Sequence, residues 1–355
     1  MRLVIAGGGT GGHLFPGLAL AEETLARGGE VLFVGCGRKI EDLALSEVPF
    51  PVKTLRAEGL IGRPLKDKLR ALVKMCLSVG EALKILKTFK PQGVFGVGGY
   101  ASVPTILAAK ILRLPCAIHE QNSVPGVANR FLGRLASKIF VSFPKTVAYF
   151  PRKKTIFSGN PVRRSILEPR IREHQGLGLL VTGGSQGARA LNRLMLQVAP
   201  RLYERFPDLF LIHQTGFADA DLVEASYASH GLPVRVYPFI KDMAWAYAQV
   251  DLVLCRAGAT TIAELCALGK PAIYIPFPYA THRHQEENAK AVVERGAGLM
   301  FREKDLNPDE LFEAICGLLE DKRRREQMSA AAQGLFPKEA LQIIVSQTEA
   351  LIAHA

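Results

Sequence analysis

Two copies of one local pattern constrain this chain more than any other feature. An apolar run at residues 3–6 leads into the glycine-rich stretch 7–12, and a helical pattern follows. The same order returns half a chain later, where the apolar run 179–182 leads into the glycine-rich stretch 183–187 and a second helical pattern. A buried strand, a glycine turn and a helix open a doubly wound nucleotide-binding unit. The chain is therefore predicted to hold two α/β domains of this kind.

Short apolar runs alternate with helical patterns in both halves, as parallel βα units do. Besides the two opening runs, the predicted strands are 31–34, 94–97, 116–118, 138–142, 209–213, 234–237, 251–255 and 272–275. The predicted helices include 15–27, 188–198, 261–268 and an amphipathic one at 338–354. We place the domain boundary near residue 160, which gives domains of 1–160 and 161–337 and a last helix at 338–355. Residues 157–161 and 168–175 are interpreted as hinge and linker.

The composition excludes a disordered chain, because 48% of the 355 residues are hydrophobic and 22% are charged. The net charge of +12 favours an anionic partner, which can be nucleic acid, a phosphorylated substrate or an acidic membrane surface. None of the six cysteines forms a C-x-x-C pair, so we expect reduced, mostly buried thiols rather than zinc ligands or disulfides. No apolar run is long enough for a secretion signal or a membrane span, which predicts a cytosolic protein.

The first glycine-rich stretch matches the dinucleotide pattern Gly7-x-Gly9-x-x-Gly12. An NAD site also needs an acid after the second strand, but that strand ends in residues 35–39, which are Gly-Cys-Gly-Arg-Lys. Arg38 could hold a 2′-phosphate, so an NADP oxidoreductase stays open. His13 follows the loop at the start of a helix, where it can titrate near neutrality or simply pack on the helix face.

The second glycine-rich stretch adds the hydroxyl of Ser185, which suits it to a diphosphate beside a helix N-terminus. Arg163 can supply a cation there, although a hinge arginine is more often solvated. Glu264 can accept hydrogen bonds from ribose hydroxyls or take part in capping its own helix. The run 282–284, His-Arg-His, has no accompanying acidic ligand pattern, so we predict no metal site.

Seven motifs stand in order along the chain. They are 8–13 (GGTGGH), 96–100 (GVGGY), 119–122 (HEQN), 159–163 (GNPVR), 183–187 (GGSQG), 256–264 (RAGATTIAE) and 276–288 (PFP through HQ to Asn288). Together they resemble the MurG family, the N-acetylglucosaminyltransferases that make lipid II in peptidoglycan synthesis. The resemblance implies a GT-B fold, which is two Rossmann-like doubly wound parallel-sheet domains facing a cleft, with the last helix packed back on the first domain. The chain departs from the family at 281–283, which are Thr-His-Arg, because we expect a small, acidic segment at this place in the family.

The resemblance also implies the substrates and their contacts. The donor is UDP-N-acetylglucosamine and the acceptor is lipid I, undecaprenyl-diphospho-N-acetylmuramoyl-pentapeptide, with no cofactor and no metal. Donor contacts fall on Thr10, Gly11, Gly12, Asn122, Arg163, Ser185, Ile240, Ala259, Thr260, Thr261, Ile262, Ala263, Glu264, Gln285 and Asn288. Within this set, Ile240 receives uracil through its backbone, Glu264 the ribose, Ser185 and Arg163 the diphosphate, and Gln285 the sugar hydroxyls. The acceptor diphosphate is expected at Gly9, Gly98, Gly99 and Tyr100.

The chemistry implied is inversion, because a β-1,4 linkage forms from an α-linked donor in a single in-line displacement. Such a reaction needs a base, and we nominate His13, with Glu120 as its rival or its orienting partner. Three other classes remain: a GT-B enzyme with another acceptor, a non-catalytic UDP-sugar-binding module, and the NADP oxidoreductase.

The segment 63–90 concentrates the charge, with eight basic residues against two acidic ones. It has one aromatic residue, Phe89, and no nucleic-acid reader motif, so no nucleic-acid partner is predicted. Apolar residues interleaved with the cations favour an interfacial helix over a merely solvated one. We expect this membrane face to lie on the anionic cytoplasmic surface of the cell membrane, through Lys66, Lys68, Arg70, Leu72, Val73, Lys74 and Leu77.

Overall fold

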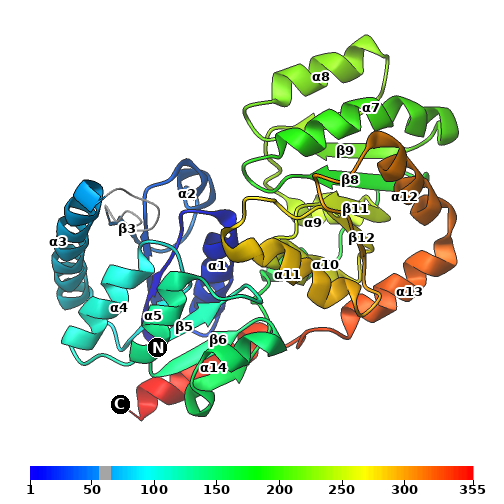
Figure 1. Ribbon diagram of the computed structural model, residues 1–355. Helices are drawn as coiled ribbons and strands as arrows, with labels where there is room; N and C mark the ends of the chain where they lie inside the picture. The colour runs from blue at the N-terminus through cyan, green and yellow to red at the C-terminus, as the bar shows by residue number, and fades with distance from the viewer. Residues whose placement is uncertain (56–64, 355) are drawn as a thin grey trace. The chain divides into compact units, whose positions relative to one another are not determined.

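The computed structural model describes residues 1–55 and 65–354, apart from the side chains of Lys39 and of residues 65–72. The chain divides into two compact units (Figure 1). Unit 1 consists of Met1–Arg163 together with Pro337–Ala355, and unit 2 is Arg164–Phe336. The first crossing between the units thus falls three residues after the boundary proposed at 160.

Unit 1 is built on a seven-stranded sheet in which every neighbouring pair is parallel, in the order β3-β2-β1-β4-β5-β6-β7. Its strands are β1 (Arg2–Ala6), β2 (Glu30–Gly35), β3 (Val52–Thr54), β4 (Gly93–Gly96), β5 (Cys116–Glu120), β6 (Lys138–Val141) and β7 (Thr155–Phe157). The central strands β4 and β5 are buried at every residue. Burial of that kind is typical of a parallel sheet covered by helices on both faces.

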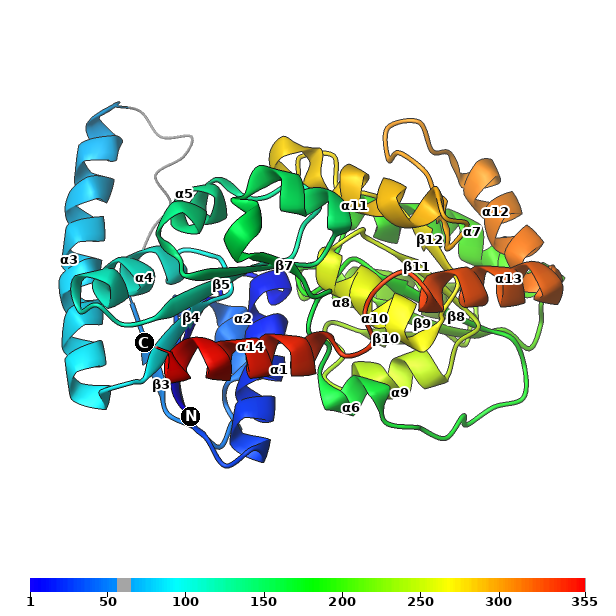
Figure 2. The ribbon, with the colours of Figure 1, turned by 90° about the horizontal axis from the view of Figure 1, so that it is seen from below.

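The helices of unit 1 are α1 (Gly11–Ala26), α2 (Lys39–Ala44), α3 (Leu65–Phe89), α4 (Ser102–Ile111), α5 (Val127–Leu135) and α14 (Ala340–Ala353), with 3₁₀ turns η1 (Pro144–Tyr149) and η2 (Arg152–Lys154). Helices α3, α4 and α5 share one apolar core with the sheet. Helix α14 packs beside α1 and contacts β6 (Figure 2). The end of the chain therefore completes the unit in which the chain begins.

Unit 2 repeats the same plan with six strands in the parallel order β10-β9-β8-β11-β12-β13. Its strands are β8 (Gly178–Thr182), β9 (Phe210–Gln214), β10 (Arg235–Tyr237), β11 (Leu252–Cys255), β12 (Ala272–Tyr274) and β13 (Leu299–Met300). Counted within the unit, the order is 3-2-1-4-5-6, the order of a doubly wound dinucleotide fold, and the first six strands of unit 1 share it. The predicted pair of Rossmann-like domains is confirmed.

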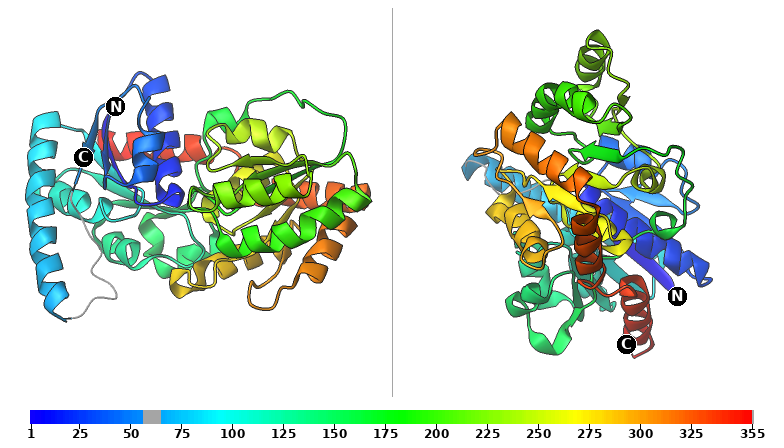
Figure 3. Two further views of the ribbon diagram at one scale, coloured as in Figure 1. Left: turned by 90° about the horizontal axis from the view of Figure 1, so that it is seen from above. Right: turned by 90° about the vertical axis from the view of Figure 1, so that its right-hand side faces the viewer.

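The helices of unit 2 are α6 (Arg164–Leu167), α7 (Arg189–Arg205), α8 (Ala220–Ser229), α9 (Met243–Ala248), α10 (Ala259–Leu268), α11 (His284–Val293), α12 (Pro308–Glu320) and α13 (Lys322–Gln333), with a 3₁₀ turn η3 (Thr281–Arg283). Helices α7, α8 and α12 share the main apolar core with strands of the sheet, and Figure 3 shows α7, in green, lying across the strands. Helix α10 ends at Gly269, whose φ of 63° gives the predicted glycine stop.

Two predicted connecting segments turned out to be structured. Ser158 and Asn160 are buried, and Gly159 lies against Pro337 and Ala340 of unit 1. The polar stretch 168–175 was wrongly interpreted as a linker, because it belongs to unit 2. There the Arg172 guanidinium donates to both carboxylate oxygens of Asp251, at 2.6 and 3.0 Å. The stretch is polar because its side chains anchor it to the surface of unit 2, not because it is a free linker.

The cysteines and the helices bear on the expected thiols and on the expected lack of a membrane span. All six cysteines are free, and four of them are buried, whereas Cys36 is half-buried and Cys76 exposed. Over the part of the chain that the structure describes, no helix combines the length and apolarity needed to cross a bilayer.

Candidate functional site

Three loops of unit 1 meet at the carboxyl ends of β1, β4 and β5. The first glycine loop, residues 7–12, contacts the turn at Gly98 and Gly99, which have φ of 93° and 78°. A Cβ on Gly98 would lie 2.6 Å from Cδ2 of His13, and one on Gly99 would lie 2.3 Å from the carbonyl oxygen of Gly8. Only glycine therefore fits at these two positions, and the backbone of the turn packs against the His13 ring.

His13 is the third residue of α1 and is partly exposed. Its Nδ1 lies 3.3 Å from the Thr10 hydroxyl. A second histidine, His119 on β5, is fully buried, and its Nε2 donates to the carbonyl oxygen of Gly159. The pKa of His119 is lowered to about 4, mainly by burial and to a smaller extent by the charge of His13. Of these two histidines, only His13 is open to a substrate.

Glu120 ends β5 and is buried, with its carboxylate turned into its own loop. It accepts hydrogen bonds from the backbone and side chain of Asn122, from the backbone of Gly126 and from the side chain of Asn129, at 2.9 to 3.2 Å. Burial raises the pKa of Glu120, and these four donors oppose that rise. The carboxylate thus shapes the loop that presents Asn122, and this occupation favours His13 over Glu120 as the base.

The first glycine loop carries a contact that its sequence did not predict. Glu41, in the first turn of α2 and 3% exposed, accepts a hydrogen bond from the N–H of Gly9 at 2.6 Å. Its other oxygen accepts from the N–H groups of Cys36 and Gly37 at 2.7 and 2.9 Å. The Gly9 amide, expected to bind the acceptor diphosphate, is therefore already engaged. We remove Gly9 from that set and keep Gly98, Gly99 and the exposed Tyr100.

Arg163 closes unit 1, and its guanidinium lies over the ring of Phe15, 4.4 Å from the ring centre. Phe15 belongs to α1, two residues after His13. The expected diphosphate-binding cation is thus stacked on the helix that carries the proposed base, a geometry that suits a flat guanidinium better than a lysine.

In unit 2, the second glycine loop is residues 183–187, between β8 and α7. Ser185 is half-exposed, and Gly184 and Gly187 have φ of 78° and 73°. A Cβ on Gly183 would lie 2.3 Å from the backbone nitrogen of Ala188, so the loop doubles back tightly before the helix. Amides at a helix start favour an anion, and a diphosphate at this loop stays a prediction.

Gln214, at the end of β9 and 3% exposed, joins this loop to a second segment. Its side chain donates to the carbonyl oxygen of Gly184 at 2.8 Å and accepts from the N–H of Ile240 at 3.1 Å. Because that N–H is engaged, a uracil ring would have to use the carbonyl of Ile240.

The start of α10 follows β11, with Gly258 as the N-cap. Glu264 is 6% exposed and accepts a hydrogen bond from the hydroxyl of Tyr247 at 2.8 Å. Ile262 is fully buried and its N–H donates to Gly258, so we remove Ile262 from the donor contacts. The first-turn amides of residues 259–261 have no intrahelical acceptor in any α-helix and keep that role.

The segment after β12 holds the expected sugar contacts. The side chain of Gln285 accepts from the N–H of Phe277 at 2.9 Å, and Asn288, fully buried, donates to the carbonyl oxygen of Ala257 at 3.3 Å. Arg256, 8% exposed, donates to the carbonyl oxygens of Ile275 and Pro276 and forms an ion pair with Glu303. These contacts make Asn288 and Arg256 supports of the loop rather than surfaces for a ligand.

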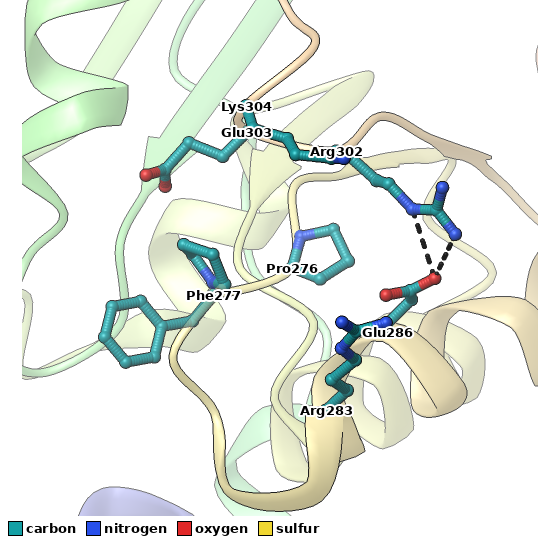
Figure 4. A pocket seen from close by; sticks show the side chains of 8 residues that line it. Pro276, Phe277, Arg283, Glu286, Arg302, Glu303 and Lys304 are labelled. Atoms are coloured by element: carbon teal, nitrogen blue, oxygen red, sulfur yellow. Dashed lines mark hydrogen bonds and ion pairs between the residues drawn. The ribbon is translucent and has the colours of Figure 1, made fainter.

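A pocket of about 210 Å³ opens beside this segment (Figure 4). Pro276 and Phe277 form its apolar side, and Arg283, Glu286 and Arg302 its charged side. Arg302 pairs with Glu286, and His282 and Arg283 both have φ near +50° (53° and 52°). This is where the sequence departs from the expected acidic segment, and the departure adds a cation at the pocket. Within the described residues, no group of three His, Cys, Asp or Glu side chains is placed to hold a metal ion.

Comparison with known proteins identifies the family of this chain. The model of the glycosyltransferase family 28 N-terminal domain matches residues 3–141, and that of the C-terminal domain matches residues 178–344. The chain belongs to glycosyltransferase family 28. Relatives of this family 28 chain include proteins of Geobacter metallireducens, 44% identical, and Geobacter sulfurreducens, 45% identical. Both alignments cover 98% of each chain, and both relatives are named UDP-N-acetylglucosamine–N-acetylmuramyl-(pentapeptide) pyrophosphoryl-undecaprenol N-acetylglucosamine transferase.

Solved structures agree with the family 28 assignment. The crystal structure of Acinetobacter baumannii MurG matches with a TM-score of 0.75 and 30% identity, over 98% of this chain and 99% of that one. A UDP-GlcNAc 2-epimerase from Neisseria meningitidis, at 15% identity and a TM-score of 0.69 over 98% and 99% of the two chains, shares the fold alone. The predicted resemblance to MurG is confirmed.

Three supports of the family 28 loops escaped sequence reasoning: Glu41, Gln214 and Arg256. Each contacts at least one segment that is distant in the sequence, and local spacing does not reveal such a contact. Arg256 stands first in its motif and Gln214 ends an apolar run, which is the position where a parallel strand delivers polar groups to a site. That position was the one available signal.

Replacing Gln214 with methionine tests the support in unit 2. The change preserves volume but leaves the Gly184 carbonyl and the Ile240 N–H without their partner, and it should raise the donor KM roughly tenfold with kcat nearly unchanged. Initial rates across donor concentrations measure both constants. Gln197→Met, on the exposed face of α7, serves as the matched control. Equal donor KM values for the two variants would show that Gln214 does not shape the donor loops.

Proposed function

We propose that this chain transfers N-acetylglucosamine from UDP-N-acetylglucosamine to the C4 hydroxyl of the N-acetylmuramoyl group of lipid I, forming lipid II for peptidoglycan synthesis. The observation that carries the proposal is the near-complete alignment, at 44% and 45% identity, with two relatives named for this transfer. The partly exposed His13 in unit 1 and the anion-favouring loop in unit 2 supply the chemical groups that this transfer needs.

Unit 2 holds the donor in this proposal. The diphosphate is bound by Ser185 and the loop amides at the start of α7, where the helix dipole favours negative charge. Glu264 accepts hydrogen bonds from the ribose hydroxyls, the carbonyl of Ile240 receives uracil, and Gln285 contacts the sugar hydroxyls. The backbone of Ala259, Thr260, Thr261 and Ala263 lines the same end of α10.

Unit 1 supplies the base and binds the acceptor. His13 takes the proton from the C4 hydroxyl while that oxygen attacks the anomeric carbon. The bond from this carbon to the phosphate oxygen breaks, and UDP leaves with its electron pair. Thr10, Gly11, Gly12, Asn122 and Arg163 contact the donor from this unit, and Arg163 offsets the charge that develops on the leaving diphosphate. Asn288 acts indirectly, by holding Ala257.

One assay separates this proposal from its rivals. Labelled N-acetylglucosamine is supplied as the UDP donor with a lipid I analogue, with and without EDTA. We expect transfer in both samples, since protein groups and no metal ion are proposed to stabilise the leaving group. Donor binding without turnover would indicate a UDP-sugar-binding module, transfer only to another acceptor would indicate a related enzyme, and loss of activity in EDTA would contradict the metal-free mechanism.

We also propose that unit 1 lies on the cytoplasmic surface of the membrane through α3. Val73 and Leu77 are 53% and 64% exposed, which is unusual for apolar side chains one turn apart. The side chains of Lys66, Lys68, Arg70 and Leu72 lie outside the described residues, and Lys74 is half-buried. A second cationic stretch, missed in the sequence, is residues 121–167, which contain nine Lys or Arg and no acid. It includes α5, where Val127 and Phe131 are exposed.

Reversing the charge of α3 tests this location. Each Lys or Arg near an anionic surface contributes about 1 kcal/mol, so changing Lys66, Lys68, Arg70 and Lys74 together to Glu should largely abolish binding at physiological salt. Co-sedimentation with vesicles containing anionic lipid, across a salt series, measures the effect. Arg130→Glu with Arg134→Glu on α5 is the comparison. A quadruple variant that pellets like wild type would move the membrane face away from α3.

A further inference from the structure

We propose that Glu41 acts as an internal anion that holds Gly9 of the first glycine loop and thereby positions His13. The inference rests on the proposed function for the role of His13. The contacts between Glu41 and the loop do not depend on that function. Glu41 is a positioning residue here, since it touches neither substrate nor the reacting atoms in this scheme.

The contacts of Glu41 are those expected of a bound anion. One oxygen accepts from Gly9 at 2.6 Å, and the other accepts from Cys36 and Gly37 at 2.7 and 2.9 Å. Three backbone N–H groups from two separate loops therefore converge on one buried carboxylate. Hydrogen bonds to an ionised acceptor are short and strong, and these three distances are short. Successive N–H groups of this kind otherwise form the cradle of a phosphate.

The glycines around the carboxylate show that the space is made for it. A Cβ on Gly8 would lie 2.4 Å from one oxygen of Glu41, and a Cβ on Gly35 would lie 2.3 Å from the other. Both positions must lack a side chain while Glu41 remains in place. A phosphate brought to this loop would find the Gly9 amide already engaged by Glu41.

The same contacts lead to His13. Gly9 has a φ of 87° and immediately precedes Thr10, whose carbonyl accepts from the N–H groups of His13 and Leu14 at 3.2 and 3.0 Å. The Thr10 hydroxyl lies 3.3 Å from Nδ1 of His13. Glu41 thus holds the residue before the N-cap of α1, and through that residue the orientation of the imidazole.

The first test is Glu41→Gln, which places an NH₂ group against backbone donors. We expect kcat to fall roughly 10²-fold, the scale of a displaced catalytic group, with the donor KM within about twofold of wild type. Glu23→Gln is the matched control, because Glu23 is an equally buried acid of unit 1 (2% exposed) that pairs with Arg27 instead. Should Glu41→Gln fail to fold, Glu41→Asp takes its place, with a smaller fall in kcat expected.

The second test restores the anion without the side chain. In Glu41→Ala, formate should enter the vacated space, raising the melting temperature and recovering part of kcat, whereas Glu23→Ala and wild type should respond no more to formate than to chloride. The melting arm needs no substrate, so it stands even if transfer to lipid I fails. Wild-type kcat in Glu41→Gln, a parallel rise in donor KM, or a formate response shared with Glu23→Ala would overturn the inference.

Discussion

His13→Ala is expected to lower kcat by roughly 10² to 10⁴ while the donor KM changes little, because removing a general base affects the transition state and not the bound donor. The structure strengthens this expectation. Of the two histidines near the loops of unit 1, His119 is fully buried with a pKa of about 4, and Glu120 is occupied by its own loop.

The measurement is steady-state transfer to a lipid I analogue at saturating donor. His230→Ala is a suitable control, since His230 is an exposed histidine of unit 2. A His13→Ala enzyme with near-normal kcat would remove His13 from the chemistry and return Glu120 to consideration.

Glu264→Ala should weaken donor binding roughly 10- to 100-fold, the effect of losing charged hydrogen bonds worth about 1.5–3 kcal/mol. A carboxylate that holds ribose acts on ground and transition states alike, so kcat at saturating donor should change little. Titration with UDP, followed by calorimetry, and the donor KM both report on this contact.

Tyr247→Phe separates the ribose contact from the packing around it. The hydroxyl of Tyr247 donates to Glu264 at 2.8 Å, and its removal leaves the carboxylate in place. We expect a change in donor KM of only a few-fold. An unchanged KM in Glu264→Ala would contradict the ribose assignment, and equal effects of the two substitutions would indicate that Glu264 acts through Tyr247.

The duplicated strand, glycine loop and helix predicted the fold well because buried parallel strands are continuous apolar runs. The strands that escaped prediction, β3, β7 and β13, are three residues or fewer and lie at or near sheet edges. Their partly exposed residues carry no apolar run. The linker at 168–175 failed for a related reason, since the Arg172–Asp251 pair that anchors it joins residues far apart in the sequence.

The same limit applies to the candidate site. Spacing identified the loops but could not tell a free amide from an engaged one, so Gly9 and Ile262 were predicted as contacts although Glu41 and Gly258 already use their N–H groups. Spacing nominated His13 as the base, but it could not show that His13 is partly exposed and that His119 is fully buried. Burial separates them, and burial depends on what the rest of the chain places around each ring.

Because α14 belongs to unit 1, the two units cannot finish folding in the order in which they emerge from the ribosome. Unit 2 is one continuous segment, Arg164–Phe336, and is complete before α14 is made. Unit 1 must wait with the surface beside α1 uncovered, including the place on Gly93 where Ile352 comes to rest. A nascent chain of this protein therefore exposes an apolar surface of its first unit until the last helix arrives, and ribosome-bound intermediates should depend on chaperones at that stage.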